Sequence, residues 1–119
     1  MKENEQIVKK IVEGIQERKG KEIVIVNMTK LQEAPCKYFV ICEGDSNVHV
    51  SSVAISIKDW VNKQIEIKPL AAAGFENAEW IAMDYGQIIV HVFQPHIRAF
   101  YDIEQLWNDA DLIRIENLN

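Results

Sequence analysis

The side chains best suited to covalent chemistry in this chain lie in the tripeptide Gly44-Asp45-Ser46, which follows an apolar run. A serine at the end of a strand can act as a nucleophile when a histidine accepts its proton. Serine esterases with a Gly-Asp-Ser block usually carry an Asp-x-x-His sequence near the C-terminus, and none of the three histidines here has an aspartate three residues before it. Ser46 is better explained as the cap of a following helix. We therefore do not expect a serine hydrolase.

Paired carboxylates suggest a second chemistry, because nucleotidyltransferases use them to hold magnesium and use a Gly-Ser turn at a helix start to hold phosphate. Glu43 and Asp45 flank Gly44 in such a turn. Asp109 and Asp111 have a suitable spacing but follow the last predicted helix, where loop and capping roles are more common. The sequence has no Walker lysine and no glycine-rich dinucleotide loop. A nucleotidyltransferase-like enzyme or nucleotide-binding protein is therefore the alternative to a protein without catalytic activity.

The spacing of histidines and cysteines does not indicate a metal site. His49 and His96 lie at predicted helix starts and His91 on a predicted strand, without the His-x-His or HExxH spacing of zinc proteins. Cys36 and Cys42 form no CxxC motif, so we expect reduced, structural thiols. We expect no cofactor and no metal ion.

Size and charge narrow the choice of partner. The 119 residues suit one domain, residues 1–119. Thirteen Lys and Arg against eighteen Asp and Glu give a net charge of -5, which favours a basic protein partner over direct nucleic-acid binding. No apolar stretch approaches the roughly 20 residues that span a bilayer, and residues 1–19 do not resemble a signal peptide. We expect a cytoplasmic protein that does not bind membranes.

The elements that must position these residues follow from the apolar pattern. Apolar residues recur every three or four positions around Ile7 to Ile15, Val50 to Val61 and Ile97 to Trp107, which predicts three helices. Strands are predicted at 22–28, 38–43, 79–84, 87–93 and 112–115, and residues 66–78 form a loop with at most a short strand. The order predicts an α/β (α+β mixed) fold in which helices cover a single mixed sheet.

Two neighbouring strands are predicted to form a hairpin with Tyr85-Gly86 as a two-residue turn. Trp80 then pairs with His91, and Ala82 with Ile89. The polar and aromatic face carries Trp80, Asp84, Gln87, His91 and Phe93, and the apolar face carries Ile81, Met83, Ile88, Val90 and Val92. The apolar face belongs to the core. The polar-aromatic face either binds a protein or lies under the third helix, which then satisfies Trp80 and His91 internally.

The stretch from Trp80 to Phe93 (WIAMDYGQIIVHVF), followed by Arg98, Tyr101, Glu104, Leu106 and Trp107, resembles the signature of the ribosomal silencing factor (Iojap) family. A second block agrees, from Tyr38 to Ser46 with His49 and Val50 after it, so the resemblance covers Ile23 to Ala110. The sequence departs from the family pattern where Asn27, Lys37 and Gln87 replace a frequent Asp, and where Ala73 replaces a Glu that commonly precedes Gly74.

This resemblance implies a function and a fold. Members bind ribosomal protein uL14 of the large ribosomal subunit, obstruct joining of the small subunit and lower translation when nutrients are scarce. Their fold is similar to that of nucleotidyltransferases but lacks the catalytic residues. The missing catalytic residues imply that the protein is not an enzyme. Organellar relatives carry targeting extensions, so we expect a bacterial cytoplasmic protein. A homodimer is compatible with the sequence as a state of the free protein.

The uL14-binding residues are predicted from the resemblance together with the hairpin face. They are Trp80, Asp84, Tyr85, His91, Arg98 and Tyr101. An aromatic anchor at the centre of an interface contributes about 2 kcal/mol or more. Tyr85→Ala is therefore expected to weaken binding at least about tenfold if Tyr85 is central.

Overall fold

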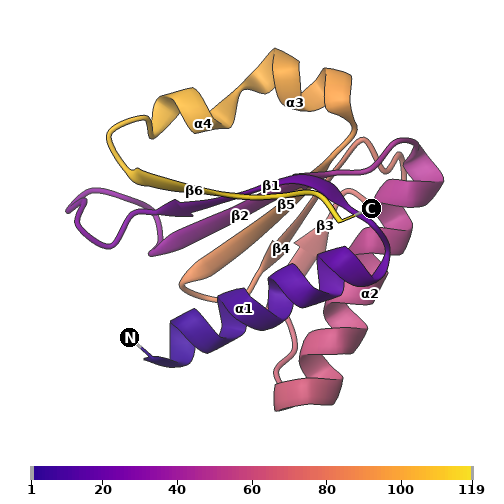
Figure 1. Cartoon of the computed structure of the whole chain (residues 1–119), viewed down its shortest axis with the longest axis horizontal. Coiled ribbons are helices and arrows are strands. Elements are labelled where there is room, and N and C mark those ends of the chain that lie inside the picture. Colours follow the sequence, from indigo (N-terminus) through magenta and orange to yellow (C-terminus); the bar gives the residue numbers. More distant parts are fainter. Residues whose placement is uncertain (1, 119) are drawn as a thin grey trace.

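The computed structural model describes residues 2–118, which form a six-stranded sheet with helices on both faces (Figure 1). In chain order the elements are α1 (Lys2–Glu17), β1 (Lys21–Asn27), β2 (Tyr38–Glu43), α2 (Asn47–Ile65), β3 (Ala71–Ala73), β4 (Trp80–Asp84), β5 (Ile88–Phe93), α3 (Pro95–Tyr101), α4 (Ile103–Leu106) and β6 (Asp111–Ile115). The five predicted strands are confirmed, and the short strand within 66–78 is β3. No helix within residues 2–118 is both long enough and apolar enough to cross a membrane.

The strands are ordered β3-β4-β5-β2-β1-β6 across the sheet. β2 and β5 run parallel, and each other neighbouring pair is antiparallel. A parallel pair requires a long crossover connection, which α2 and the β3-β4 segment supply. α1 and α2 lie on one face of the sheet, and α3 and α4 lie on the other (Figure 1). The predicted mixed α/β sheet is therefore confirmed.

The first two helices pack closely because both are amphipathic. Ile11 and Ile15 of α1 are fully buried, and Ile57 of α2 is buried with them. A Cβ atom added to Gly14 would lie 2.9 Å from the Cα of Ile57, which is closer than side chains normally approach a backbone. Glycine therefore allows the two helix backbones to approach each other.

The central strands have apolar residues on both faces because helices cover both faces there. In β1, Ile23 and Ile25 face the α1-α2 layer, whereas Val24 and Val26 face the α3-α4 layer. Strands buried on both sides lose the alternation of polar and apolar residues. The unbroken apolar run in the sequence is thereby explained.

The predicted turn of the β4-β5 hairpin is wrong. Trp80 pairs with Phe93, Ala82 pairs with His91, and the Tyr85 N–H donates to the Ile88 carbonyl at 2.8 Å, so the turn is Gly86-Gln87. Gly86 has φ +93°, which glycine adopts without strain, and its N–H donates to the Asp84 carboxylate at 2.7 Å. The pairing is displaced by two residues, and side chains alternate with a period of two. The predicted division into a polar-aromatic face and an apolar face is therefore confirmed for the strand residues, whereas Gln87, expected on the polar-aromatic face, lies in the turn.

The third predicted helix is also corrected, because the segment forms two short helices, α3 and α4. Asp102 adopts a left-handed conformation with φ 43°, and its N–H donates to the Arg98 carbonyl at 2.8 Å, which ends α3. This break rotates the following residues out of the helical period. After the break, Leu106 is 72% exposed although it was expected on the apolar side, whereas Ile103 and Trp107 pack against the sheet. Before the break, Ile97 packs against the sheet, but Phe100, also expected on the apolar side, is 77% exposed.

Candidate protein-binding site

The Gly44-Asp45-Ser46 turn caps α2. The Ser46 hydroxyl accepts a hydrogen bond from the His49 N–H at 3.1 Å, as an N-cap residue does. His49 Nδ1 accepts the Asp45 N–H at 2.8 Å, and His49 Nε2 lies 2.7 Å from the Arg18 carbonyl oxygen. Both ring nitrogens are therefore engaged by the backbone, and His49 is not placed to deprotonate Ser46.

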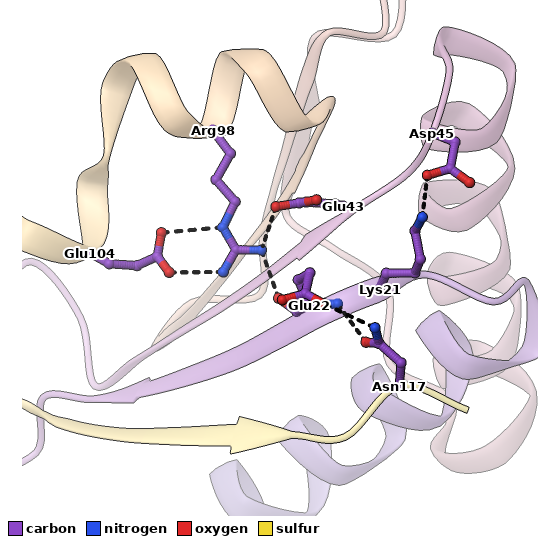
Figure 2. Close-up of polar contacts among 7 residues, drawn as sticks. All are labelled: Lys21, Glu22, Glu43, Asp45, Arg98, Glu104 and Asn117. Carbon is purple, nitrogen blue, oxygen red and sulfur yellow. Dashed lines mark hydrogen bonds and ion pairs between the residues drawn. The ribbon is translucent and has the colours of Figure 1, made fainter. Parts of the chain in front are cut away.

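Three of the four candidate carboxylates have basic partners: Glu43, Asp45 and Asp111. Glu43 pairs with Arg98 at 3.2 Å, and Asp45 pairs with Lys21 (Figure 2). Asp111 begins the exposed last strand, and its Oδ2 lies 3.9 Å from Lys30 Nζ. Within residues 2–118 no three His, Cys, Asp or Glu side chains gather as a metal site would require. Glu43 and Asp45, which flank Gly44, are therefore each held by a basic side chain of the chain itself.

His91 is a buried residue on the polar-aromatic face. The residue is 7% exposed, and its ring lies edge-on to Phe39 with centroids 4.7 Å apart. Its Nδ1 accepts a hydrogen bond from Trp80 Nε1 at 3.0 Å, which leaves the ring proton of the neutral imidazole on Nε2. Burial lowers the pKa of His91 to about 4. His91 is therefore a neutral residue that orients Trp80.

Trp80 and Tyr101 form the exposed aromatic part of the same face. Their ring centroids are 5.0 Å apart, so the end of α3 packs on the start of β4. Tyr101 is 51% exposed and Trp80 is partly exposed. The ring of the neighbouring Phe100 packs edge-on against Tyr101, with the ring centroids 5.0 Å apart. Exposed aromatic residues in contact with one another are typical anchors of protein interfaces.

A shallow apolar depression lies on the same side of the sheet, near the β3 edge. It has a volume of about 270 Å³ and is lined by Ala71, Ala72, Ala73, Ala82, Met83, Asp84 and Ile89. The alanines of β3 pair with β4, where Ala73 lies opposite Ala82. Short side chains leave the sheet surface accessible, so a partner could place larger side chains there. We call the Trp80-Tyr101 pair, of which Trp80 is partly exposed, and this depression together the docking surface.

Several acidic residues lie at the docking surface. Glu76 and Glu79 are exposed and line a second hollow of about 210 Å³, which includes Trp80 and Tyr101. Asp84 lies in the apolar depression, and Asp102 directly follows Tyr101. Negative charge at the rim of an apolar patch favours association with a basic partner.

Two predicted binding residues, Arg98 and Tyr85, are buried elsewhere. Arg98 is 8% exposed and is engaged by carboxylates within the chain. Tyr85 is 8% exposed and packs in the α1-α2 layer, where burial raises its pKa to about 12. Within residues 2–118 its hydroxyl has no hydrogen-bond partner. The structure thus brings Trp80, Asp84, His91 and Tyr101 to one face, but neither Arg98 nor Tyr85 presents its side chain there.

The depression was not predicted from the sequence. Apart from Met83 and the predicted Asp84, its members are small or aliphatic residues: the alanines of β3 together with Ala82 and Ile89. The available signal was the run Ala71-Ala72-Ala73 after Pro69, because three small residues on a short strand leave its surface uncovered. The run could be interpreted in this way only once β3 was known to form the edge of the sheet.

Comparison with known proteins gives one consistent family. The sequence model of a family described as ribosomal silencing factor during starvation matches residues 1–119. A ribosomal silencing factor from Halalkalibacterium halodurans is 34% identical over 116 residues, which cover 97% of each chain. More distantly, a mouse protein named mitochondrial assembly of ribosomal large subunit protein 1 is 29% identical over 72 residues, which cover 59% of this chain and 32% of the mouse protein.

A solved structure supports the same fold. The crystal structure of protein CV0518 from Chromobacterium violaceum superposes with a TM-score of 0.81. It is 33% identical, and the match covers 87% of this chain and 85% of that one. The arrangement of the sheet and helices is therefore shared with an experimentally determined relative.

Proposed function

The chain belongs to the ribosomal silencing factor family, and we propose that it binds ribosomal protein uL14 on the large ribosomal subunit and obstructs the small subunit. Membership implies a ribosome-associated role in translation regulation. The finer assignment, uL14 as partner and obstruction as mechanism, follows the family signature from Trp80 to Phe93. The mouse relative, whose name places it in assembly of the large ribosomal subunit, is consistent with this choice of subunit.

The single observation that carries the proposal is the docking surface. Tyr101 is 51% exposed and packs on Trp80 beside an apolar depression of about 270 Å³. A protein partner would remove these aromatic and alanine side chains from water, which favours association by about 25 cal/mol per Å² of apolar area. Because the surface is shallow, it suits another protein better than a small molecule.

Charge supports a basic partner. The chain has a net charge of -5, and Glu76, Glu79 and Asp84 lie at the docking surface. Complementary charge increases the association rate and orients the complex, and added salt reduces the effect. We therefore expect association with uL14 to slow as the salt concentration increases.

The mechanism requires no reaction. Binding places a protein of 13.7 kDa beside uL14, and its bulk occupies space that the small subunit needs. We propose that no catalytic residue takes part. The contacts of Ser46, His49 and Glu43 within the chain support this view.

Two sedimentation experiments test the proposal. We expect the protein to cosediment with purified large subunits and not with small subunits. Large subunits incubated with an excess of the protein should then form fewer joined ribosomes when small subunits are added. Joined ribosomes at an undiminished level, with the protein bound to the large subunit, would contradict the proposed mechanism.

A matched pair of variants tests the surface. Tyr101→Ala should weaken binding to large subunits about tenfold, equivalent to about 1.4 kcal/mol. Val48→Ala is the control, because Val48 is 74% exposed on α2, outside the docking surface. Equal affinities for the two variants, both folded by thermal melt, would place the interface elsewhere.

A further inference from the structure

The α3-α4 segment, residues 95–106, covers part of the sheet but cannot hold its own position. α3 has seven residues and α4 has four, and neither N-cap residue, Gln94 or Asp102, makes a side-chain capping bond. Isolated helices of this length are unstable in water. The position of the segment must therefore depend on its contacts with the sheet.

Arg98 makes polar contacts between this segment and two strands (Figure 2). Its Nε and Nη2 donate to the two carboxylate oxygens of Glu104 in α4, at 3.2 and 2.8 Å. Its Nη1 donates to the Glu22 carbonyl in β1 at 2.6 Å and to the Glu43 carboxylate in β2 at 3.2 Å. One guanidinium group thus joins α3, α4, β1 and β2.

Glu22, whose carbonyl accepts the bond from Arg98, lies where the strand is irregular. The β1-β2 register shifts between Lys21 and Val24, and Glu22 has φ 52°, which is unfavourable for a residue with a side chain. The N–H and the carboxylate of Glu22 bond to the Asn117 amide at 2.8 and 2.9 Å. The strained residue is thus held by Asn117 near the C-terminus and by Arg98 through its carbonyl.

A lysine could not reproduce these contacts. The bonds to Glu104 use Nε and Nη2, whereas those to Glu22 and Glu43 use Nη1, so the acceptors surround a planar group with separated donors. Lysine carries all its donors on one nitrogen. Arg98→Lys therefore keeps the charge and loses part of the geometry.

We infer that Arg98 is a positioning residue that fixes α3 so that Tyr101 stays packed on Trp80 and the docking surface is preformed. Tyr101 lies three residues after Arg98, and the Arg98 carbonyl accepts the Asp102 N–H that closes the helix. The inference rests on the proposed function and gives Arg98 a role inside the chain in place of a contact with the partner.

The first test compares Arg98→Lys with the parent by amide hydrogen exchange and by binding to large subunits. We expect exchange in residues 95–106 to become at least about tenfold faster while the buried amides of α1 and α2 stay protected. Binding should weaken about tenfold under conditions where the thermal melt shows a folded protein. Lys21→Gln is the control, because it breaks the nearby Lys21-Asp45 pair without touching α3.

A second variant separates positioning from stability. Arg98→Met combined with Glu43→Gln and Glu104→Gln removes the charges that Arg98→Met alone would leave unpaired in a buried place. We expect this triple variant to melt closer to the parent than Arg98→Met does, and still to bind weakly. Recovery of parental binding together with stability would show that Arg98 only stabilises the fold.

The hydrogen-exchange and binding measurements can fail independently, so this inference can be tested separately from the proposed function. If the parent does not cosediment with large subunits, the proposed function fails, and with it the link between Arg98 and docking. Amide hydrogen exchange of Arg98→Lys still tests whether Arg98 holds residues 95–106 in position. Unchanged exchange of these residues in Arg98→Lys, or faster exchange with parental binding, overturns the inference.

Discussion

Replacing Tyr85 by phenylalanine should stabilise the protein, because its hydroxyl is buried without a hydrogen-bonding partner within residues 2–118. The residue is 8% exposed, and the ring packs in the α1-α2 layer. Burying a hydroxyl without a hydrogen bond costs about 1–3 kcal/mol by mutational measurements. Tyr85→Phe removes this cost and keeps the ring.

The expected gain is smaller than the full cost, because the missing oxygen leaves a void. A void of roughly 15 Å³ costs about 0.4 kcal/mol at about 24 cal/mol per Å³. The free energy of unfolding of Tyr85→Phe should thus rise by about 1 kcal/mol. For a domain of this size, such a gain raises the melting temperature by about 4 °C.

Urea denaturation and calorimetry measure this gain, and a binding assay completes the test. Tyr85→Phe should bind large subunits like the parent, because the hydroxyl is not accessible to a partner. A variant destabilised by about 1 kcal/mol or more would show that the hydroxyl makes a hydrogen bond in the folded protein. A stable variant that loses binding would refute the burial of Tyr85 and support its place at the interface.

Two further predictions concern the core. Gly14→Ala should lower the free energy of unfolding by about 1–3 kcal/mol, because its Cβ would lie 2.9 Å from the Ile57 Cα. Lys9→Ala, on the exposed side of α1, is the control and should change this free energy little. Urea denaturation measures both. The pKa of His91 is lowered to about 4 in the folded protein from 6.5, so the unfolded chain binds more protons between these values. Stability should therefore fall by up to about 3 kcal/mol as the pH falls from about 6.5 to about 4. A His91→Gln variant with the same pH dependence of unfolding would contradict this assignment.

The parts of the fold that the sequence predicts correctly are those where local pattern and burial agree. β1 and β2 are continuous apolar runs because helices cover both faces of the sheet, and the α1 stripe repeats with the helical period because only one side is buried. The hairpin faces were predicted correctly although the turn was not, because a displacement of two residues preserves the alternation of side chains. The break at Asp102 was missed because a left-handed residue other than glycine has no strong sequence signal.

The candidate site was less predictable, because burial depends on residues distant in sequence. Arg98 looks like an exposed binding residue until Glu22 and Glu43, 76 and 55 positions away, are brought beside it. Tyr85 matches the family signature, but its ring points to the core side of the hairpin. The alanines of β3 became interpretable only when the strand order placed them at an edge.

The most direct test of the central claim places opposite charges at one point of the docking surface. Ala73 is exposed in the apolar depression, so Ala73→Glu and Ala73→Arg change the surface similarly in size and should fold alike by thermal melt. The measurement is the dissociation constant of each variant for purified uL14 at low and at moderate salt. If this surface binds basic uL14, Ala73→Arg should bind at least about tenfold more weakly than Ala73→Glu, and the difference should shrink as salt is added. Equal affinities of the two variants at low salt would contradict the claim that this face docks on uL14.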